Sequence, residues 1–132
     1  MKPGIVIFCC TNAVAAPEDE VERVNAAHQA VVKFTRLPCS GRTDVLYILR
    51  AIEDGADVAI VVGCPDGGCQ FLEGSRRARL RVRYANRLLA EAGVGEERVR
   101  MVTLTPDEPQ GFVNALQEAI AKAHQLVSRG AA

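Results

Sequence analysis

The sequence predicts an α/β fold in which a four-stranded parallel sheet carries helices on both of its faces. Four short apolar runs typical of strands occur at residues 4–9, 32–37, 57–62 and 99–104. They alternate with four longer stretches whose apolar residues recur at helical spacing. The connections are short, and such an alternation is typical of a parallel sheet with crossover helices.

The first half of the chain is predicted to contain two strand–helix units. A small-residue loop at 11–16 follows the first strand, and a helix begins at Pro17, because proline and acidic residues suit a first helical turn. The apolar residues of this helix are expected to be Val21, Val24, Ala27 or His28, and Val31. Pro38 ends the second strand, and a helix at about 43–54 is predicted to bury Val45, Leu46, Leu49 and Ile52.

The second half repeats the same alternation. Residues 57–62 are uninterrupted and apolar, as expected of a central parallel strand, and a glycine-rich loop spans 63–69. A helix at about 74–92 is predicted to bury Leu80, Tyr84, Leu88 and Leu89. The last helix, about 109–127, is predicted to bury Phe112, Val113, Leu116, Ile120 and Val127. Right-handed crossovers then favour a flavodoxin-like or Rossmann-like strand order, 2-1-3-4.

The composition limits the class of protein. A chain of 132 residues suits one domain with one core, so we expect residues 1–132 to form a single domain. Sixteen basic residues balance sixteen acidic ones, which argues against a general nucleic-acid binder. No apolar run approaches the ~18 residues of a membrane span, and the N-terminus lacks a signal-peptide pattern. We therefore expect a cytoplasmic protein whose thiols stay reduced, with neither nucleic acid nor membrane as a partner.

All five cysteines lie at the ends of strand-like runs. Cys9 and Cys10 end the first run, Cys39 follows the second, and Cys64 and Cys69 follow the third. The carboxyl ends of parallel strands share one edge of a sheet, so these thiols are expected to converge there. Convergent thiolates hold soft metals and iron–sulfur clusters in proteins. All five are therefore candidate cofactor-binding residues.

The local patterns refine this candidate site. Four residues separate Cys64 from Cys69, and the intervening glycines allow the backbone amides to approach a cluster closely. Cys39 precedes a predicted helix start, where free amides favour a thiolate. Neighbouring strand side chains point to opposite faces, so one of Cys9 and Cys10 is expected to be the fourth ligand beside Cys39, Cys64 and Cys69. Periodicity leaves that choice open; Cys10 lies nearer the following loop and is preferred.

Three alternatives compete with an iron–sulfur cluster. Buried cysteine often only fills space, but five cysteines on one inferred edge make coincidence less probable. A four-cysteine site also suits zinc, although structural zinc sites usually show two short cysteine hooks. Thiol–disulfide exchange by Cys9 and Cys10, or by Cys64 and Cys69, is weakened by the absence of a C-x-x-C motif.

Arginines crowd the helix predicted at about 74–92. This pattern indicates either a docking face for an acidic partner or an ordinary solvated helix face, and the sequence alone favours neither. The arginines are Arg76, Arg77, Arg79, Arg81, Arg83 and Arg87. Only Arg76 and Arg77 are expected near the cysteine edge, because the helix starts there.

These residues also resemble a known family. The similar segments are Phe8-Cys9-Cys10, Cys39-Ser40-Gly41-Arg42-Thr43-Asp44, Ile48-Leu49, Glu53-Asp54-Gly55-Ala56-Asp57, Val62 to Cys69, Glu73-Gly74 and Arg77. Together they resemble the delta subunit family of methyl-viologen-reducing hydrogenase, which is also known as the iron–sulfur subunit family of F420-non-reducing hydrogenase. The resemblance spans nearly the whole chain.

The resemblance implies a small [2Fe-2S] protein that does not itself activate hydrogen. It implies electron relay between a hydrogenase, or another donor module, and the flavin subunit of heterodisulfide reductase. One position departs from the family pattern. The first motif of the family resembles Cys-Cys-x-x-Cys, and here Ala13 occupies the third cysteine position, after Asn12. Four potential ligands remain. The alternative is a cluster-free thiol-redox protein or a zinc-stabilised adaptor in the same complex.

Overall fold

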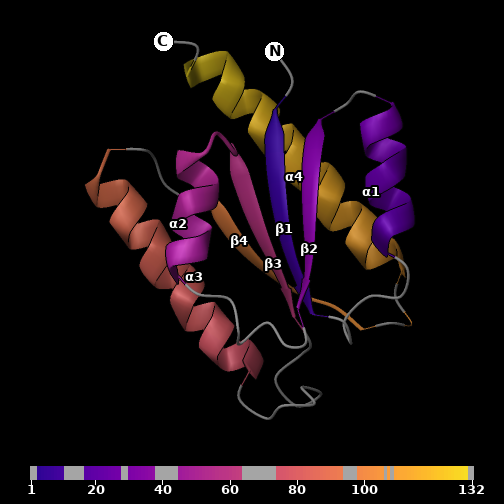
Figure 1. Ribbon diagram of the computed structural model, residues 1–132, viewed down its shortest axis with the longest axis horizontal. Helices are drawn as coiled ribbons and strands as arrows, with labels where there is room; N and C mark the ends of the chain where they lie inside the picture. The colour runs from indigo at the N-terminus through magenta and orange to yellow at the C-terminus, as the bar shows by residue number, and fades with distance from the viewer. Residues whose placement is uncertain are drawn as a thin grey trace.

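The predicted fold class is confirmed. A computed structural model describes residues 3–10, 17–27, 30–37, 45–63, 74–93, 98–105, 107 and 109–130. Its strands pair in parallel in the order β2-β1-β3-β4 (Figure 1). They are β1 (Gly4–Cys10), β2 (Val31–Leu37), β3 (Val58–Gly63) and β4 (Val99–Thr103). The helices are α1 (Pro17–Ala26), α2 (Val45–Glu53), α3 (Gly74–Glu91) and α4 (Pro109–Gly130).

The sheet separates two apolar cores. Helices α1 and α4 cover one face, and α2 and α3 cover the other (Figure 1). Alternate residues of β1 and β3 enter opposite cores: Ile7 and Ile60 face α1 and α4, while Phe8 and Val61 face α2 and α3. Every residue of β3 is buried, as its continuous apolar sequence predicted. None of the helices in the described part of the chain is long and apolar enough to cross a membrane.

The first helix is shorter than its sequence pattern predicts. α1 ends at Ala26, and Val31, which the pattern places on its apolar stripe, is instead the first residue of β2. Val21 and Val24 are buried as predicted, whereas Val31 is exposed. Val31 continues the helical spacing of Val21 and Val24, but it is equally suited to the start of a strand. Hydrophobic spacing alone does not indicate where the helix ends.

The buried stripes of α2 and α3 differ in part from the prediction. In α2 the buried residues are Ile48 and Ile52, and Leu46 is exposed. In α3 the core positions are Ala78, Val82, Ala85 and Leu89. Leu80 and Tyr84, which the sequence predicts to be buried, are 57% and 46% exposed. Alanines at the inner positions allow α3 to approach the sheet and α2 closely, so the larger apolar residues lie outside. In α4 the prediction is confirmed for Phe112, Leu116 and Ile120.

Two local devices fix the amino ends of the central strands. At the end of α2, Gly55 has a φ of 115°, its N–H donates to Ile52 O, and Ala56 N donates to Ala51 O. This bonding pattern is a Schellman cap, which needs the left-handed backbone that glycine adopts most easily. Asp57 then joins β1 to β3: its N–H donates to Gly4 O at 2.7 Å, and its Oδ2 accepts from Gly4 N at 2.8 Å.

Candidate functional site

The carboxyl edge of the sheet brings together the chain positions from which the cysteine-bearing segments leave. Cys10 pairs with Leu37 in β2, and Cys9 pairs with Val62 in β3. Leu37 lies two residues before Cys39, and Val62 lies two residues before Cys64. Adjacent strands are about 4.8 Å apart, so the chain leaves β2 and β3 on either side of β1. The predicted convergence of these three strand ends is confirmed.

Cys9 is the one cysteine whose side chain the structure describes. Cys39, Cys64 and Cys69 lie outside the described residues, as does Ala13, and of Cys10 the structure describes the backbone as the last residue of β1. The ligand set therefore stays a prediction. Among the described residues, no three His, Cys, Asp or Glu side chains gather as a metal site would require. His124 is exposed on α4, and His28 lies outside the described part of the chain.

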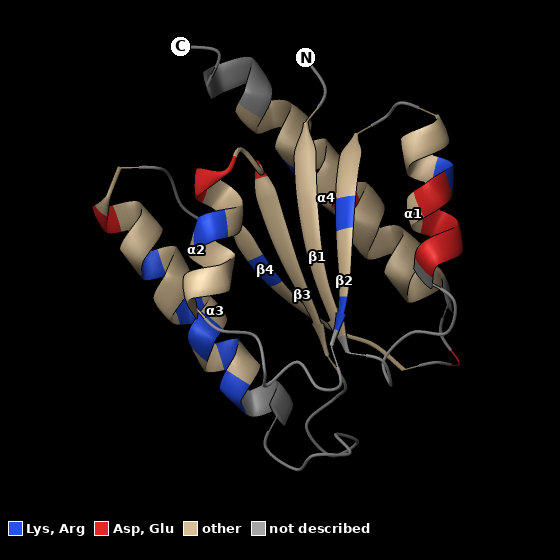
Figure 2. Ribbon diagram, in the orientation of Figure 1, with Lys and Arg blue, Asp and Glu red and all other residues tan. Residues whose placement is uncertain are grey.

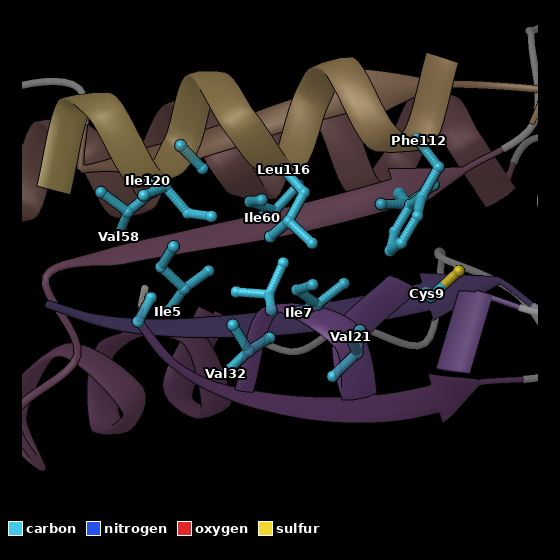
Figure 3. Close-up of a cluster of buried hydrophobic side chains, with 14 of the residues drawn as sticks. Ile5, Ile7, Cys9, Val21, Val32, Val58, Ile60, Phe112, Leu116 and Ile120 are labelled. Atoms are coloured by element: carbon cyan, nitrogen blue, oxygen red, sulfur yellow. The ribbon is translucent and has the colours of Figure 1, made fainter. Parts of the chain in front are cut away.

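Cys9 is part of the hydrophobic core. Its exposed fraction is 0%, and it belongs to the cluster that β1 and β3 form with α1 and α4. Figure 3 shows its sulfur at one end of this cluster, which also contains Phe112 of α4 and Val21 of α1. A cysteine buried among apolar side chains behaves as a small hydrophobic residue that fills space in the core. This environment suits a packing role for Cys9 better than a ligand role.

An ion pair joins two elements at the same edge. Arg36 occupies the position next to the last residue of β2, and its Nε and Nη2 donate to the Glu18 carboxylate at 2.9 Å each. Glu18 is the second residue of α1. A backbone hydrogen bond and the Arg36 guanidinium hold the pKa of Glu18 below its ordinary value. The pair holds the start of α1 against the end of β2, where Arg36 is paired in register with Cys9 and Leu37 with Cys10.

Sequence reasoning misses this pair. The sequence indicates Glu18 only as an acid suited to a helix start, and Arg36 only as part of a strand. They are eighteen positions apart in the sequence, and no local pattern indicates that the start of α1 lies beside the end of β2. The proximity of Glu18 to Arg36 could be predicted once the strand order is known. A helix that connects two parallel strands, β1 and β2, must begin at the edge where both strands end.

A groove lies away from the cysteine edge, on the face of the sheet that carries α2 and α3. Its volume is about 610 Å³, and it runs between β2 and α2. Its walls include Val31 and Lys33 from β2, Tyr47 and Arg50 from α2, and Gly4 at the start of β1. β2 is the edge strand on this side, and α2 packs against β3, so the outer part of this face is left open.

Comparison with known proteins identifies the family. A profile of the methyl-viologen-reducing hydrogenase delta subunit family matches residues 5–127. The chain is 37% identical to the vhu iron-sulfur subunit of F420-non-reducing hydrogenase from Methanocaldococcus jannaschii, over 96% of this chain and 94% of that protein. It is 33% identical to the iron-sulfur subunit of F420-non-reducing hydrogenase from Archaeoglobus profundus, over 95% and 91%.

A second kind of relative contains a similar segment within a longer chain. One subunit of the ferredoxin/F(420)H(2)-dependent CoB-CoM heterodisulfide reductase of Methanosarcina acetivorans is 25% identical over 124 residues, which are 94% of this chain but 16% of that protein. The family resemblance noted in the sequence is therefore confirmed by the profile match and by the hydrogenase iron-sulfur relatives. The chain belongs to the methyl-viologen-reducing hydrogenase delta subunit family.

Proposed function

We propose that this protein is an electron-transfer subunit that carries one [2Fe-2S] cluster at the carboxyl edge of its sheet. It would receive electrons from a hydrogenase or another donor module and pass them to a heterodisulfide reductase-like flavoprotein. The observation that carries the proposal is the strand register, which aligns Cys10 with Leu37 and Cys9 with Val62 at one edge. Thiolates from these segments form the donor set that iron–sulfur clusters require.

The relatives support both parts of the proposal. Two of them are named as iron-sulfur subunits of a hydrogenase, which agrees with the cysteine pattern. In the heterodisulfide reductase relative, a segment similar to this chain is part of the reductase polypeptide itself. A module that is joined to that polypeptide in one protein and separate in another is well placed to exchange electrons with it. The cluster supplies the redox chemistry, and this chain supplies the ligands, the surroundings and the docking.

Four thiolates are proposed as ligands: Cys10, Cys39, Cys64 and Cys69. The burial of Cys9 in the α1–α4 core is the reason for placing Cys10 rather than Cys9 in this set. Ala13 removes one thiol from the pattern of the family, so the proposal assigns all four ligands from the remaining cysteines. The backbone amides of Gly67 and Gly68 are proposed to donate hydrogen bonds to sulfur and so to adjust the reduction potential.

Metal analysis of anaerobically purified protein tests the proposal. We expect about two iron atoms and about two acid-labile sulfides per chain, with an EPR signal that appears on reduction. Cys39→Ser, Cys64→Ser and Cys69→Ser should each remove most of the iron. Stoichiometric zinc, or reversible thiol oxidation in a metal-free protein, would instead identify the adaptor or thiol-redox alternative.

A second measurement tests the relay. Reduced protein is mixed with the heterodisulfide reductase flavoprotein of the same organism, and flavin reduction is followed by its absorbance. Transfer that depends on Cys64 supports the proposed direction of electron flow. A loaded cluster that neither reduces this flavoprotein nor accepts electrons from a hydrogenase would contradict the relay while leaving the cluster assignment intact.

A further inference from the structure

Exposed apolar side chains gather on one side of the molecule. Among the described residues, the large hydrophobic side chains that are exposed are Val31, Leu46, Tyr47, Leu80 and Tyr84. Leu46 and Tyr47 belong to α2, Leu80 and Tyr84 to α3, and Val31 lines the groove beside α2. All five therefore lie on the face of the sheet that carries α2 and α3. The confinement of these exposed apolar residues to one face makes that face the candidate for an interaction surface.

The outer side of α3 has the composition of a protein-binding surface. Leu80, Arg83, Tyr84 and Arg87 recur at helical spacing on one side of the helix, opposite the buried Ala78, Val82, Ala85 and Leu89. We call these four exposed residues the α3 ridge. The Arg87 guanidinium carbon lies 5.2 Å from the centre of the Tyr84 ring, so the two side chains form one preorganised cation–π unit. Tyrosine and arginine are among the residue types that most often dominate binding energy at interfaces.

The charge of α3 costs the helix stability. α3 contains six arginines and one glutamate, and its first turn contains no acidic residue. Positive charge near a helix N-terminus opposes the helix dipole, whereas α1 begins with the stabilising arrangement of three acidic residues. Arg83 and Arg87 are also four residues apart, and like charges at this spacing destabilise a helix by about 0.2–0.5 kcal/mol. The like charges of Arg83 and Arg87 weaken the helix at this spacing, and a role in binding accounts for their presence.

The charge distribution also argues against a second copy of this chain as the occupant. Figure 2 shows the largest group of acidic residues on α1, on the other side of the sheet from the arginines of α3, and a smaller group at the end of α2. Two of these acids already have internal partners, because Glu18 binds Arg36 and Glu20 binds Arg23. Fewer acidic residues of a second copy are therefore available to pair with the arginines of α3. Carboxylates from another protein are the better match for them.

We propose that the α3 ridge is the docking site for a protein partner that presents carboxylates around an apolar centre. Leu80 and Tyr84 would be covered by apolar side chains, and Arg83 and Arg87 would pair with Asp or Glu of the partner. This inference rests on the proposed role in an electron-transfer complex, and it assigns the surface and the charge of the partner. α3 begins five residues after Cys69, and the ridge begins at Leu80, six residues (about 9 Å) further along the helix.

Two matched pairs of variants of the full-length chain test the proposal. In Tyr84→Ala the aromatic anchor is lost, while Tyr84→Phe retains the ring and its contact with Arg87. In the Arg83→Glu/Arg87→Glu variant the ridge charge is reversed, while Lys33→Glu/Lys122→Glu makes the same charge change on β2 and α4. Tagged variants are purified anaerobically from the native host, and recovered proteins are identified and quantified by mass spectrometry. Each protein lost selectively is then purified and titrated against the wild-type chain.

We expect one or more proteins to be lost with Tyr84→Ala and with the ridge reversal but retained with both controls. In titrations, Tyr84→Ala should weaken binding at least about tenfold. The ridge reversal should weaken it about a hundredfold at low salt, and added salt should weaken wild-type binding much more than binding of the reversed variant. Thermal unfolding followed by circular dichroism shows whether each variant still folds. An Arg83→Gln/Arg87→Gln variant removes the positive charge without adding negative charge, and it should also bind more weakly.

Three outcomes would overturn the inference. The first is partner recovery that no ridge variant changes. The second is a partner whose affinity does not depend on salt. The third is a wild-type chain that dimerises alone and becomes monomeric on ridge reversal, which would assign the ridge to self-association. Iron and EPR measurements on the same preparations separate this test from the test of the cluster. If the ridge variants lose a partner selectively although no cluster is present, the docking proposal is supported and the cluster proposal is not. If the cluster is present and the ridge variants bind their partners normally, the docking proposal is wrong.

Discussion

The side-chain amide of Asn86 in α3 hydrogen-bonds both backbone groups of Val99 in β4, as a neighbouring strand would do. Its Nδ2 donates to Val99 O at 2.8 Å, and its Oδ1 accepts from Val99 N at 3.0 Å. Asn25 of α1 makes the same two bonds with Val32 of β2, at 3.1 and 2.9 Å. β2 and β4 are the two edges of the sheet, so each edge is bonded at one residue by a side-chain amide from an adjacent helix.

Replacing Asn86 should therefore destabilise the fold. Asn86→Ala leaves both polar groups of Val99 without their protein partner, and we expect the free energy of unfolding to fall by about 1–3 kcal/mol. Asn86→Asp keeps the acceptor for Val99 N but places a carboxylate oxygen against Val99 O, where two acceptors repel each other, so it should not restore the wild-type stability. Urea unfolding followed by circular dichroism measures both. Equal stability of Asn86→Ala and wild type would contradict this interpretation.

The Asp57 clamp gives a second stability prediction. Asp57 bonds both backbone groups of Gly4, and thus ties the start of β1 to the start of β3. Asp57→Ala removes the side-chain acceptor and should cost about 1–3 kcal/mol, because Gly4 N then loses a bond to a charged group. Asp57→Asn retains an acceptor and should retain part of this stability. Thermal unfolding of the three proteins provides the comparison, and an Asn variant weaker than the Ala variant would argue against the clamp.

The C-cap of α2 predicts a purely conformational effect. A Cβ at Gly55 would meet nothing within 4 Å, and the same holds at Gly93, whose φ is 79°. Gly55→Ala should nevertheless cost about 1–2 kcal/mol, because an L-residue is strained at positive φ. Gly93→Ala should show the same direction for the same reason. Denaturant midpoints measure both variants, and unchanged midpoints would mean that these turns relax at no cost.

The Glu18–Arg36 pair predicts a pH dependence. Because the pKa of Glu18 is lowered on folding, its contribution is present above the ordinary pKa and is lost as the pH falls through the lowered value. The pair is partly exposed, so we expect Glu18→Gln to cost less than about 1 kcal/mol at pH 7. The difference from wild type should disappear at an acidic pH below the lowered pKa of Glu18. Glu22→Gln, with the same charge change on the same helix, is the control, and urea unfolding at both pH values is the measurement.

The two neighbouring cysteines should respond differently to mutation. Cys9 is fully buried in the α1–α4 core, so Cys9→Ala should lower the free energy of unfolding by about 1–2 kcal/mol while iron remains bound. Cys10→Ala should instead remove most of the iron. Iron content per chain and urea unfolding are measured on the same anaerobic preparations. If Cys9→Ala loses iron and Cys10→Ala retains it, the fourth ligand is Cys9, and the packing interpretation is wrong.

Much of the fold could be predicted from the sequence because periodicity and chain order carry the necessary information. The continuous apolar run at β3, the alternation of strands and helices, and right-handed crossovers together predicted the order β2-β1-β3-β4. The same reasoning predicted that the segments bearing Cys10, Cys39 and Cys64 leave the sheet at one edge. These properties follow from local residue patterns and from general rules for connecting parallel strands.

Tertiary packing alone decided which apolar stripe of α3 is buried. Leu80 and Tyr84 form a convincing stripe in sequence, but Ala78, Val82, Ala85 and Leu89 form a second one, and the helix can bury only one side. The small side chains face inward because they allow close packing against the sheet and α2. Likewise, only the assembled layers bring Arg36 to Glu18. Such choices depend on the shapes of surfaces that are distant in sequence, which no local pattern records.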